Sequence, residues 1–585
     1  MSEMSGTDAS GISSEQRGEE LNTIRAYMQN SLEEFHVAGA AVAVVKDGEV
    51  IFQEGFGVRD MKQGLPVTKD TLFAIGSSTK AFTTMSVAML VDDGKLDWDT
   101  PVASYLPEFK LHDKYASDHA TLRDLATHRV GLPRHDMAWY KAPFSREELL
   151  QRLVHLPFTK PFRTTFQYQN LMYMTLGCLA GKVSGLGWED FVKSRIFTPL
   201  GMHRSNFSVY ESQQDADFAK PYKVVNERID EMPFANIDAI GPAGSVNSSV
   251  AEMAAWVQFH LGEGRSQGNQ LVSENNLSQM YNPHIAVLEP TLSDRIMFES
   301  YGLGWFTEVY AGHHVVHHGG NIDGFSAIVA MVPKEQLGVV VLTNQQHSVL
   351  PRAAAYTIID TLLGLPTVDW NTIGREYREK IVASMRESTA QKDTDRIANT
   401  HPSHGLSDYV GEFEHPGYGE VSIALMDDNL WYIHHSQDKP LVLEHYHYDV
   451  FTITVGEGDM TEQLKVQFHT NLRGQLASLH IQFEPMLEPF EFVRKALPPT
   501  EGTMETYLGD YDLAGRVITV ALRGEHTLVV TVPGQPTYEL VAASQREFNI
   551  KGLPGFAIEF MVDDEGTCSE VKFKQPNGTF VLKRC

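Results

Sequence analysis

Apolar and β-branched residues gather in two pairs of short runs that open and close the first part of the chain. The first pair, residues 38–46 and 49–57, flanks Asp47-Gly48, and the second pair lies within residues 326–344. An Asp-Gly dipeptide between two such runs favours a tight hairpin. Between the pairs the apolar spacing is helical, as in residues 80–94. The pattern predicts one sheet that gathers both ends of a domain, with a helical region inserted.

The last part of the chain changes to short alternating runs separated by turn residues, such as EVSIAL, LWYIHH, FTITV and SLHIQF. This alternation is typical of an antiparallel sandwich or barrel. The segment at residues 409–413 (YVGEF) is repeated at residues 507–511 (YLGDY). Strands and turns follow both segments in the same order, so the pattern predicts two tandem small barrels rather than a solenoid.

These patterns divide the 585 residues of the chain into five predicted segments. We expect a disordered polar tail, an α+β domain, a linker helix with a loop, and two small antiparallel β-barrels. Their predicted boundaries are, in that order, 1–18, 19–368, 369–404, 405–497 and 498–585.

The composition of the chain limits which classes of binding partner we expect. The formal net charge is -27, and hydrophobic residues make up 42% of the chain. Phosphate backbones and anionic lipid surfaces attract Lys and Arg, so we expect neither nucleic acid nor a membrane as a partner. The N-terminus lacks a basic and apolar leader, and no apolar run is long enough to span a bilayer. The three cysteines show no pairing or metal spacing, so a cytoplasmic location is expected.

The first candidate for chemistry is Ser77-Ser78-Thr79-Lys80, which directly precedes a predicted helix. At a separation of three positions, Lys80 lies one helical turn from Ser77 and on the same face. Its amine can then reach the serine oxygen, and the helix N-terminus favours developing negative charge. For Ser77 taken alone, a plain N-cap is the structural alternative.

The second candidate is the tripeptide Tyr168-Gln169-Asn170. A phenol whose pKa is lowered by nearby cations can relay the serine proton, and the Asn170 amide can donate to a substrate carbonyl. Taken alone, this tripeptide is better explained by a packed tyrosine.

The third candidate is the run His317-His318-Gly319-Gly320, just before an apolar strand. Glycines let a substrate approach the strand backbone closely. The N–H of Gly320 is expected to complete an oxyanion hole with the N–H of Ser77. A glycine-rich turn is the alternative for the run alone. No third ligand accompanies the histidines at a recognisable spacing, so we expect no metal and no cofactor.

In this order the three motifs resemble those of class C β-lactamases, penicillin-binding proteins and related esterases and peptidases. Residues 125–133 (LATHRVGLP), 199–202 (PLGM) and 241–245 (GPAGS) also match stretches of that family. The resemblance covers roughly residues 25–365 and implies a β-lactamase/transpeptidase-like fold. It implies that the acylated nucleophile is Ser77, that its proton is handled by Lys80 and Tyr168, and that the substrate is lined by Asn170, His317 and Gly319.

One departure from the family bears on the substrate. Many penicillin-recognising enzymes have Lys-Thr-Gly where this chain has His317-His318-Gly319, and a neutral histidine is a weaker partner for a carboxylate. The architecture resembles that of D-aminopeptidases and related peptidases with lipocalin-like barrels, which implies a cytoplasm-compatible peptidase. In D-aminopeptidases a loop of the last barrel restricts the substrate. Residues 551–556 are one candidate for that loop, although an ordinary barrel turn explains them more simply.

We therefore predict a metal-free serine hydrolase that acts on a small peptide, amide or ester through an acyl-enzyme on Ser77. A carboxylesterase or weak β-lactamase on the same site is the enzyme alternative. A catalytically silent sensor or binding module with the same fold is the alternative from another class. The oligomeric state stays open, with a homo-oligomer among the options.

Overall fold

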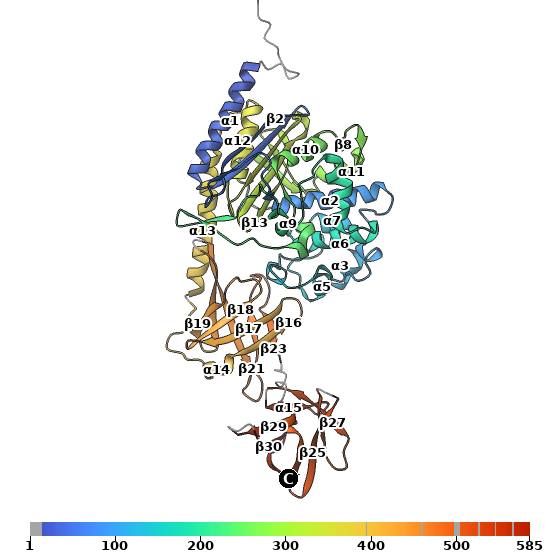
Figure 1. Ribbon diagram of the computed structural model, residues 1–585, viewed down its shortest axis with the longest axis vertical. Coiled ribbons are helices and arrows are strands. Elements are labelled where there is room, and N and C mark those ends of the chain that lie inside the picture. Colours follow the sequence, from blue (N-terminus) through green and yellow to red (C-terminus); the bar gives the residue numbers. More distant parts are fainter. Residues whose placement is uncertain are drawn as a thin grey trace, which may run out of the picture.

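The structure, a computed structural model, describes residues 14–393, 395–457, 460–495, 503–524, 527–544, 546–563 and 567–585. In chain order they form an α+β domain, a first closed barrel and a second closed barrel (Figure 1). This order confirms the predicted fold class. Among the described residues, no helix combines the length and the apolar character that crossing a membrane requires.

A nine-stranded sheet forms the centre of the α+β domain, in the order β10-β11-β12-β13-β14-β15-β1-β2-β3. β1 pairs with β15, with Ala40 opposite Thr343, so both ends of the domain share one sheet, as the sequence pattern predicts. Asp47 and Gly48 join β1 to β2 with positive φ at both residues, which a two-residue hairpin requires. The strands span Gly39–Lys46 (β1), Glu49–Asp60 (β2), Leu65–Pro66 (β3), Ile285–Ala286 (β10), Ile296–Tyr301 (β11), Phe306–Tyr310 (β12), His313–Ile322 (β13), Phe325–Val332 (β14) and Leu337–Thr343 (β15).

Helices cover both faces of this sheet. The side chains of Val42 and Val341 point toward α1 and α12, whereas those of Ala43 and Val340 point toward the inserted helical region, because neighbouring strand residues face opposite ways. The main helices span Ser14–Glu34 (α1), Lys80–Asp92 (α2), Lys114–His119 (α3), Leu122–Ala126 (α4), Arg146–Arg152 (α5), Asn170–Ser184 (α6), Trp188–Val192 (α7), Val209–Ser212 (α9), Val250–Leu261 (α10), Glu274–Tyr281 (α11), Leu350–Leu362 (α12) and Trp370–Asp393 (α13).

The beginning of α1 differs from the expected disordered tail over residues 1–18. Residues 14–18 are helical, and Arg17 pairs with Glu20 one turn further on, at 3.1 Å. This i,i+3 ion pair supports an earlier helix start than the apolar spacing predicts. Residues 1–13 of the expected tail lie outside the described residues.

Each barrel is a closed ring of eight strands, which confirms the tandem barrels predicted from the repeat. In both, a short helix ends at the repeated tyrosine, Tyr409 or Tyr507. An arginine of the last strand, Arg494 or Arg584, donates to the carbonyl of the residue after that tyrosine. The strands span Gly411–His415 (β16), Gly419–Met426 (β17), Asn429–His434 (β18), Leu441–His447 (β19), Val450–Glu457 (β20), Met460–Thr470 (β21), Leu476–Ile481 (β22), Phe490–Arg494 (β23), Gly509–Leu513 (β24), Arg516–Arg523 (β25), Thr527–Thr531 (β26), Thr537–Ala542 (β27), Glu547–Ile550 (β28), Ala557–Val562 (β29), Cys568–Gln575 (β30) and Gly578–Arg584 (β31).

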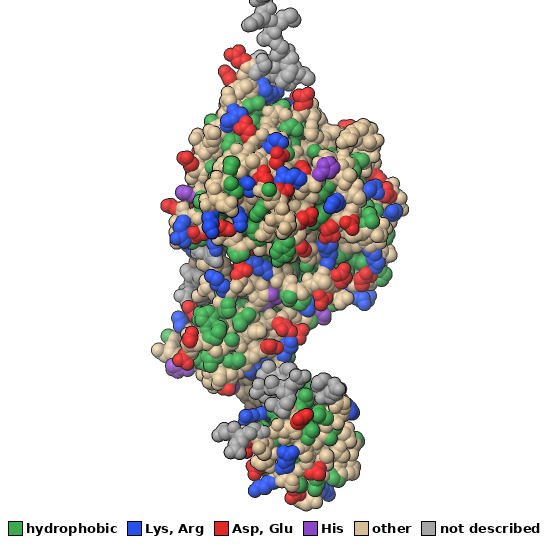
Figure 2. Space-filling view, in the orientation of Figure 1, with side chains coloured by type: hydrophobic (Ala, Val, Ile, Leu, Met, Phe, Trp, Pro, Cys, Tyr) green, Lys and Arg blue, Asp and Glu red, His purple; other side chains and the backbone are tan. Residues whose placement is uncertain are grey.

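The two barrels differ in how they attach to the rest of the molecule. The first barrel shares a continuous hydrophobic core with the α+β domain, whereas the second has a core of its own. An ion pair between Arg473 and Glu547, at 2.9 Å, joins the two barrels. Figure 1 shows the second barrel beyond the first, on the side away from the α+β domain. Figure 2 shows Lys and Arg interspersed with Asp and Glu on the visible face of the α+β domain.

Candidate active site

Ser77 lies in a single 3-10 turn, Gly76–Thr79, that leads directly into α2. It is half-buried, whereas its neighbours in the turn are buried. The caps of the turn and of α2 are Ile75 and Thr79, and neither makes a side-chain cap bond. The N-cap alternative for Ser77 is therefore wrong, and Ser77 is the one partly exposed residue of the turn.

The Lys80 amino group is buried among three oxygen atoms. Its Nζ lies 3.0 Å from Ser77 Oγ, 2.7 Å from Asn170 Oδ1 and 2.8 Å from Ala243 O. Burial lowers the pKa of Lys80 well below its ordinary value, and the charge of Arg134 lowers it further, because both disfavour the ammonium form. A neutral amine keeps two N–H bonds and turns its lone pair toward the Ser77 hydroxyl, so it can accept the serine proton.

Tyr168 lies against the same pair. Its ring centre is 4.7 Å from Lys80 Nζ and 5.3 Å from the guanidinium carbon of Arg134, and the Ser77 side chain lies near enough to its hydroxyl to influence its pKa. Burial raises the pKa of Tyr168 above its ordinary value, although the Ser77 side chain and the charge of Arg134 act the other way. The nearby cation thus lowers this pKa as expected, but burial outweighs it and the net shift is upward. Tyr168 is a neutral hydroxyl that can both donate and accept a proton.

Asn170, the first residue of α6, extends this cluster toward the protein surface. Its Oδ1 accepts from Lys80, and its Nδ2 lies 3.5 Å from Asp136 Oδ1. The preceding residue, Gln169, caps α6 by accepting from the Leu171 N–H at 2.7 Å, which fixes where Asn170 points. The structure thus brings the residues of the first two predicted motifs into one cluster.

Strand β13 passes beside the Ser77 turn, and its side chains alternate between the two faces of the sheet. Val315 belongs to the core under α1 and α12, and Val316 to the core that contains α2. By the same alternation His317 points toward α12 and His318 toward Ser77. The prediction that His317 lines the site is therefore wrong by one position, and His318 lies there instead.

His318 is buried between the Ser77 cluster and β11. Its Nε2 lies 3.0 Å from the Tyr301 hydroxyl, and its ring centre is 6.3 Å from that of Tyr168. Its backbone carbonyl accepts from Ser78 Oγ at 3.1 Å, which ties β13 to the Ser77 turn. Burial lowers the pKa of His318 to about 3, and the charge of Lys80 acts in the same direction. His318 is therefore neutral at physiological pH.

The His317 side chain lies on the opposite face of β13, the face to which position 319 also belongs. It has polar neighbours of its own there. Its Nε2 lies 3.3 Å from Glu308 Oε2. The side chains of Glu299, Glu308 and His317 bring their ligand atoms within 4.8 Å of one another, a grouping that the sequence spacing does not predict. The Arg352 guanidinium lies 3.8 Å from Glu308, so one carboxylate of this cluster already has a cation beside it.

The end of β13 approaches the Ser77 turn closely enough to require glycine. A Cβ at Gly320 would lie 1.8 Å from Ile75 O and 3.2 Å from Ser77 N. A Cβ at Gly76, whose φ is +52°, would lie 2.8 Å from Asn321 N. Since no side chain fits in either place, the backbone of Gly320 and Asn321 flanks the Ser77 N–H directly. This is the backbone arrangement that an oxyanion hole uses.

Two charged residues at the entrance of the site were not predicted from the sequence. Arg134 and Asp136 directly follow residues 125–133, the matched stretch that could have identified them. Arg134 Nε lies 2.6 Å from Asp136 Oδ2, and the Arg134 side chain is 54% exposed. Because the cluster behind it is largely buried, Arg134 is a charge that an incoming substrate can meet.

A loop of the first barrel completes this entrance. Glu484, between β22 and β23, accepts a hydrogen bond from the backbone N–H of His135 at 2.6 Å. The Tyr418 hydroxyl of the same barrel lies 2.6 Å from His135 Nδ1. Burial raises the pKa of Glu484 to about 7, because a desolvated carboxylate is disfavoured. The first barrel therefore contacts His135, the residue between Arg134 and Asp136.

The structure agrees with the interpretation of residues 551–556 as an ordinary barrel turn. Residues 551–556 belong to the turn between β28 and β29 of the second barrel, where Lys551 bonds to Glu539 at 2.9 Å. Figure 1 places that barrel on the far side of the first barrel. The first barrel, rather than the second, bounds the candidate site.

The sheet and the Ser77 cluster together define a β-lactamase-like domain. Residues 23–363 match the family described as Beta-lactamase. This match covers more than half of the chain, and the chain belongs to that family. Residues 395–494, which contain the first barrel, match a domain of unknown function, DUF3471.

Relatives in this family include proteins named for hydrolysis. Unguisins hydrolase ungD' of Aspergillus campestris is 29% identical over 429 residues, which cover 69% of this chain and 78% of that protein. Unguisins hydrolase ungD of Aspergillus violaceofuscus is 28% identical over 497 residues, or 78% of this chain and 87% of that protein. Protein flp of Staphylococcus aureus is 25% identical over 341 residues, or 57% of this chain and 64% of that protein.

Solved structures share the fold. The octameric penicillin-binding protein homologue from Pyrococcus abyssi aligns with a TM-score of 0.53 and 23% identity, covering 81% of this chain and 99% of that chain. A crystal structure of SurE aligns with a TM-score of 0.50 and 20% identity, covering 82% of this chain and all of that chain. At this identity the likeness concerns the fold alone.

Proposed function

We propose that this protein is a serine hydrolase that cleaves small amides, peptides or esters through an acyl-enzyme on Ser77. The observation that carries the proposal is the 3.0 Å separation of Lys80 Nζ from Ser77 Oγ, combined with the lowered pKa of Lys80. A buried amine without a carboxylate partner destabilises a fold unless it is neutral. A neutral amine beside an accessible hydroxyl is what nucleophilic catalysis by serine requires.

Each group of the site has its own role in the proposed reaction. Ser77 Oγ attacks the substrate carbonyl carbon, and its proton passes to Lys80 Nζ, directly or through the Tyr168 hydroxyl. The N–H of Ser77 and the backbone of Gly320 and Asn321 stabilise the negative oxygen. The leaving amine or alcohol takes the proton from Lys80 or Tyr168. Water then attacks the acyl-enzyme by the reverse proton route and releases the acid.

Amides and peptides are the favoured substrates. Two relatives are named as hydrolases of unguisins, and the motif order with two barrels resembles D-aminopeptidases. His318 is neutral and Arg134 is paired with Asp136, so no unpaired cation among these described residues selects a substrate carboxylate. This arrangement favours substrates without a carboxylate next to the scissile bond.

A substrate panel tests the proposal. It contains p-nitroanilides of D- and L-amino acids, short p-nitrophenyl esters and a chromogenic cephalosporin, each assayed with wild type, Ser77→Ala and Ser78→Ala. Ser78 is the matched control because it is the neighbouring hydroxyl and bonds only to the His318 carbonyl in the described contacts. We expect turnover of p-nitroanilides by wild type and Ser78→Ala, and none by Ser77→Ala.

The other outcomes identify the alternatives. Turnover of esters alone would make the protein a carboxylesterase, and preferential turnover of the cephalosporin would make it a β-lactamase. A protein that binds members of the panel without turning over any of them would be a silent binding module, and the proposal would be wrong.

A further inference from the structure

The carboxylate of Asp136 is held in place at the entrance of the site. Arg134 Nε lies 2.6 Å from its Oδ2, and Trp139 Nε1 donates to its Oδ1 at 3.1 Å. The same Oδ1 lies 3.5 Å from Nδ2 of Asn170. Gln169 Nε2 donates to the backbone carbonyl of Arg134 at 3.3 Å, which joins the segment of Asp136 to the start of α6. Asp136 therefore has a fixed position beside the Asn170 amide.

The two ends of the Asn170 amide face different chemical groups. Its Oδ1 accepts from Lys80 Nζ at 2.7 Å, and its Nδ2 faces the Asp136 carboxylate. A carboxylate accepts hydrogen bonds and does not donate them. Reversing the amide would place its oxygen against a carboxylate oxygen, where the two negative charges repel each other. Asp136 therefore favours the orientation in which the Asn170 oxygen faces Lys80.

This orientation determines where the lone pair of Lys80 points. A neutral amine has two N–H bonds and one lone pair. The oxygens of Asn170 and Ala243, at 2.7 and 2.8 Å, accept both N–H bonds, which leaves the lone pair to the Ser77 hydroxyl at 3.0 Å. An NH2 group of Asn170 in the same place would instead donate to Lys80 and occupy its lone pair.

We propose that Asp136 is a positioning residue of the Ser77 site, which orients the Asn170 amide so that the lone pair of Lys80 faces Ser77. Among the described contacts, Asp136 is joined to Lys80 through Asn170. Arg134 holds the carboxylate from its other oxygen. This inference rests on the proposed serine hydrolase function, in which Lys80 is the base.

Asp136 and Arg134 also act on the charge state of Lys80. Burial lowers the pKa of Lys80, the charge of Arg134 lowers it further, and the charge of Asp136 raises it. Removing either charge should therefore shift the pH at which Lys80 takes up a proton, in opposite directions. Loosened packing at the entrance would not produce two opposite shifts.

Other titratable groups face Lys80 or its two charged neighbours. They are Tyr168 and Tyr173, whose ring centres lie 4.7 and 5.4 Å from Nζ, the buried His128 and His318, and Glu484 of the first barrel. Burial raises the pKa of both tyrosines and lowers the pKa of both histidines, so all four stay neutral at physiological pH. Glu484 has a pKa of about 7, so pH series are compared in a Glu484→Gln background.

Fluorophosphonate labelling measures the step that Lys80 assists and needs no choice of substrate. Ser77 Oγ displaces fluoride from phosphorus, and its proton passes to Lys80. At alkaline pH we expect Asp136→Asn to label about tenfold more slowly than wild type, because an amide at position 136 can turn either its oxygen or its NH2 group toward Asn170. In an Asn170→Ala background, the same substitution should change the rate by less than about twofold.

The pH dependence of the labelling rate is the second readout. The rate falls at low pH because protonated Lys80 cannot accept the serine proton. This fall should move to lower pH in Asp136→Asn and to higher pH in Arg134→Gln. Should Asp136→Asn fail to fold, Asp136→Ala takes its place, since it also removes the carboxylate beside Asn170.

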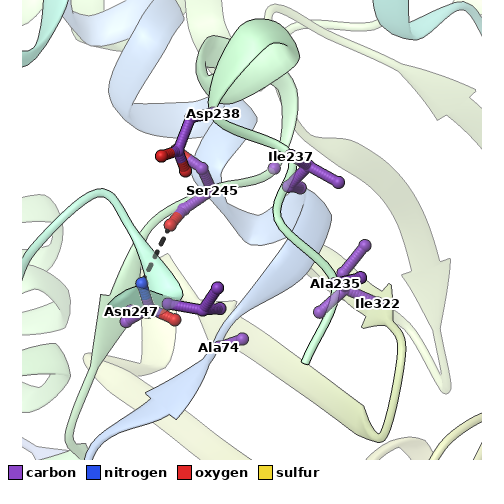
Figure 3. Close-up of a pocket in the computed structure, with 9 residues that line it drawn as sticks. Ala74, Ala235, Ile237, Asp238, Ser245, Asn247 and Ile322 are labelled. Carbon is purple, nitrogen blue, oxygen red and sulfur yellow. Dashed lines mark hydrogen bonds between the residues drawn. The ribbon is translucent and has the colours of Figure 1, made fainter. Parts of the chain in front are cut away.

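Asp238 provides a matched control near the Ser77 turn. It lines a small pocket (Figure 3) together with Gly244, where an added Cβ would lie 3.8 Å from the carbonyl carbon of Gly76. Its Oδ2 accepts from two other side chains, both at 2.9 Å, and among the contacts of the described residues none joins it to Asn170. Asp238→Asn should therefore keep the wild-type pH dependence.

The outcomes separate this inference from the proposed function. Failure of the probe to label Ser77 in wild type would overturn the proposed function and the inference with it. The role of Asp136 would be overturned, while the serine hydrolase function stands, by any of three results. These are an undiminished rate in a folded Asp136→Asn variant, an equal loss in the Asn170→Ala background, and pH shifts in the same direction in both charge variants.

Discussion

The backbone N–H of His135 donates a hydrogen bond to Glu484 Oε1 at 2.6 Å, across 349 positions of the sequence. His135 lies between Arg134 and Asp136, which contact Tyr168 and Asn170. A loop of the first barrel is therefore part of the wall of the candidate active site. The first barrel also shares the hydrophobic core of the α+β domain, whereas the second does not.

Glu484 is expected to make stability depend on pH. Its pKa is about 7 in the folded protein and about 4.3 in an unfolded chain, so the folded state binds the proton more tightly. The free energy of unfolding should therefore fall as pH rises from about 4.3 to about 7, by on the order of 4 kcal/mol. Glu484→Gln should lack this fall, measured by thermal unfolding at pH 5 and pH 8.

A matched control makes the Glu484 result specific. Glu444 is an exposed carboxylate on β19 of the same barrel, and Glu444→Gln should keep the wild-type dependence on pH. If Glu484→Gln also kept that dependence, the buried contact with His135 would not be its source.

His318 is expected to stay neutral throughout the range in which the enzyme can be assayed. Its pKa of about 3 means that KM for a carboxylate-bearing substrate should not improve between pH 8 and pH 5. His318→Gln should lower kcat/KM about tenfold or more, because the imidazole lies between Tyr301 and Tyr168. His317→Gln should change kcat/KM less, since His317 lies on the other face. A KM that improves near pH 6.5, and a larger effect at His317, would reverse this assignment.

Removal of the second barrel is expected to leave catalysis intact. Its core is separate, and the entrance of the site is built by the first barrel. A chain ending at residue 495 should keep kcat/KM on a small ester and its order of substrate preference within about twofold. A folded truncation with altered preference would show that the second barrel also reaches the substrate.

Chelators are expected to leave activity unchanged, because every proposed step uses side chains and backbone N–H groups. The acidic cluster of Glu299, Glu308 and His317 lies on the opposite face of β13, where Arg352 is paired with Glu308. Dialysis against EDTA followed by assay with and without added zinc checks this. Activity that is lost on dialysis and restored by zinc would show that this cluster, or another, holds a required metal.

Much of the site was predictable because its motifs depend on local spacing. A lysine three positions after a serine at a helix start must fall beside it, and the structure places Lys80 there. Which side chains of β13 face Ser77 was not predictable in the same way. Val315 and Val316 are both buried, and two consecutive histidines follow, so no alternation of polar and apolar residues marks which histidine faces Ser77.

Contacts between distant segments were also beyond the sequence pattern. The bond from His135 to Glu484 joins an entrance loop to a barrel loop, and neither loop carries a periodic signal. The pKa of Tyr168 depends on its burial in the folded domain, which a tripeptide motif does not determine. The closed barrels, in contrast, follow from alternating strands and the repeated tyrosine segments.

Covalent labelling by a fluorophosphonate, read by intact-protein mass and peptide mapping, tests the central claim about Ser77 and Lys80 most directly. The geometry predicts one adduct, on Ser77, in wild type and Ser78→Ala, and none in Ser77→Ala. Lys80→Arg, whose guanidinium stays charged, should label about 10²- to 10⁴-fold more slowly. An adduct that persists in Ser77→Ala or maps to Ser78, or an undiminished labelling rate in Lys80→Arg, would contradict the assignment of nucleophile and base.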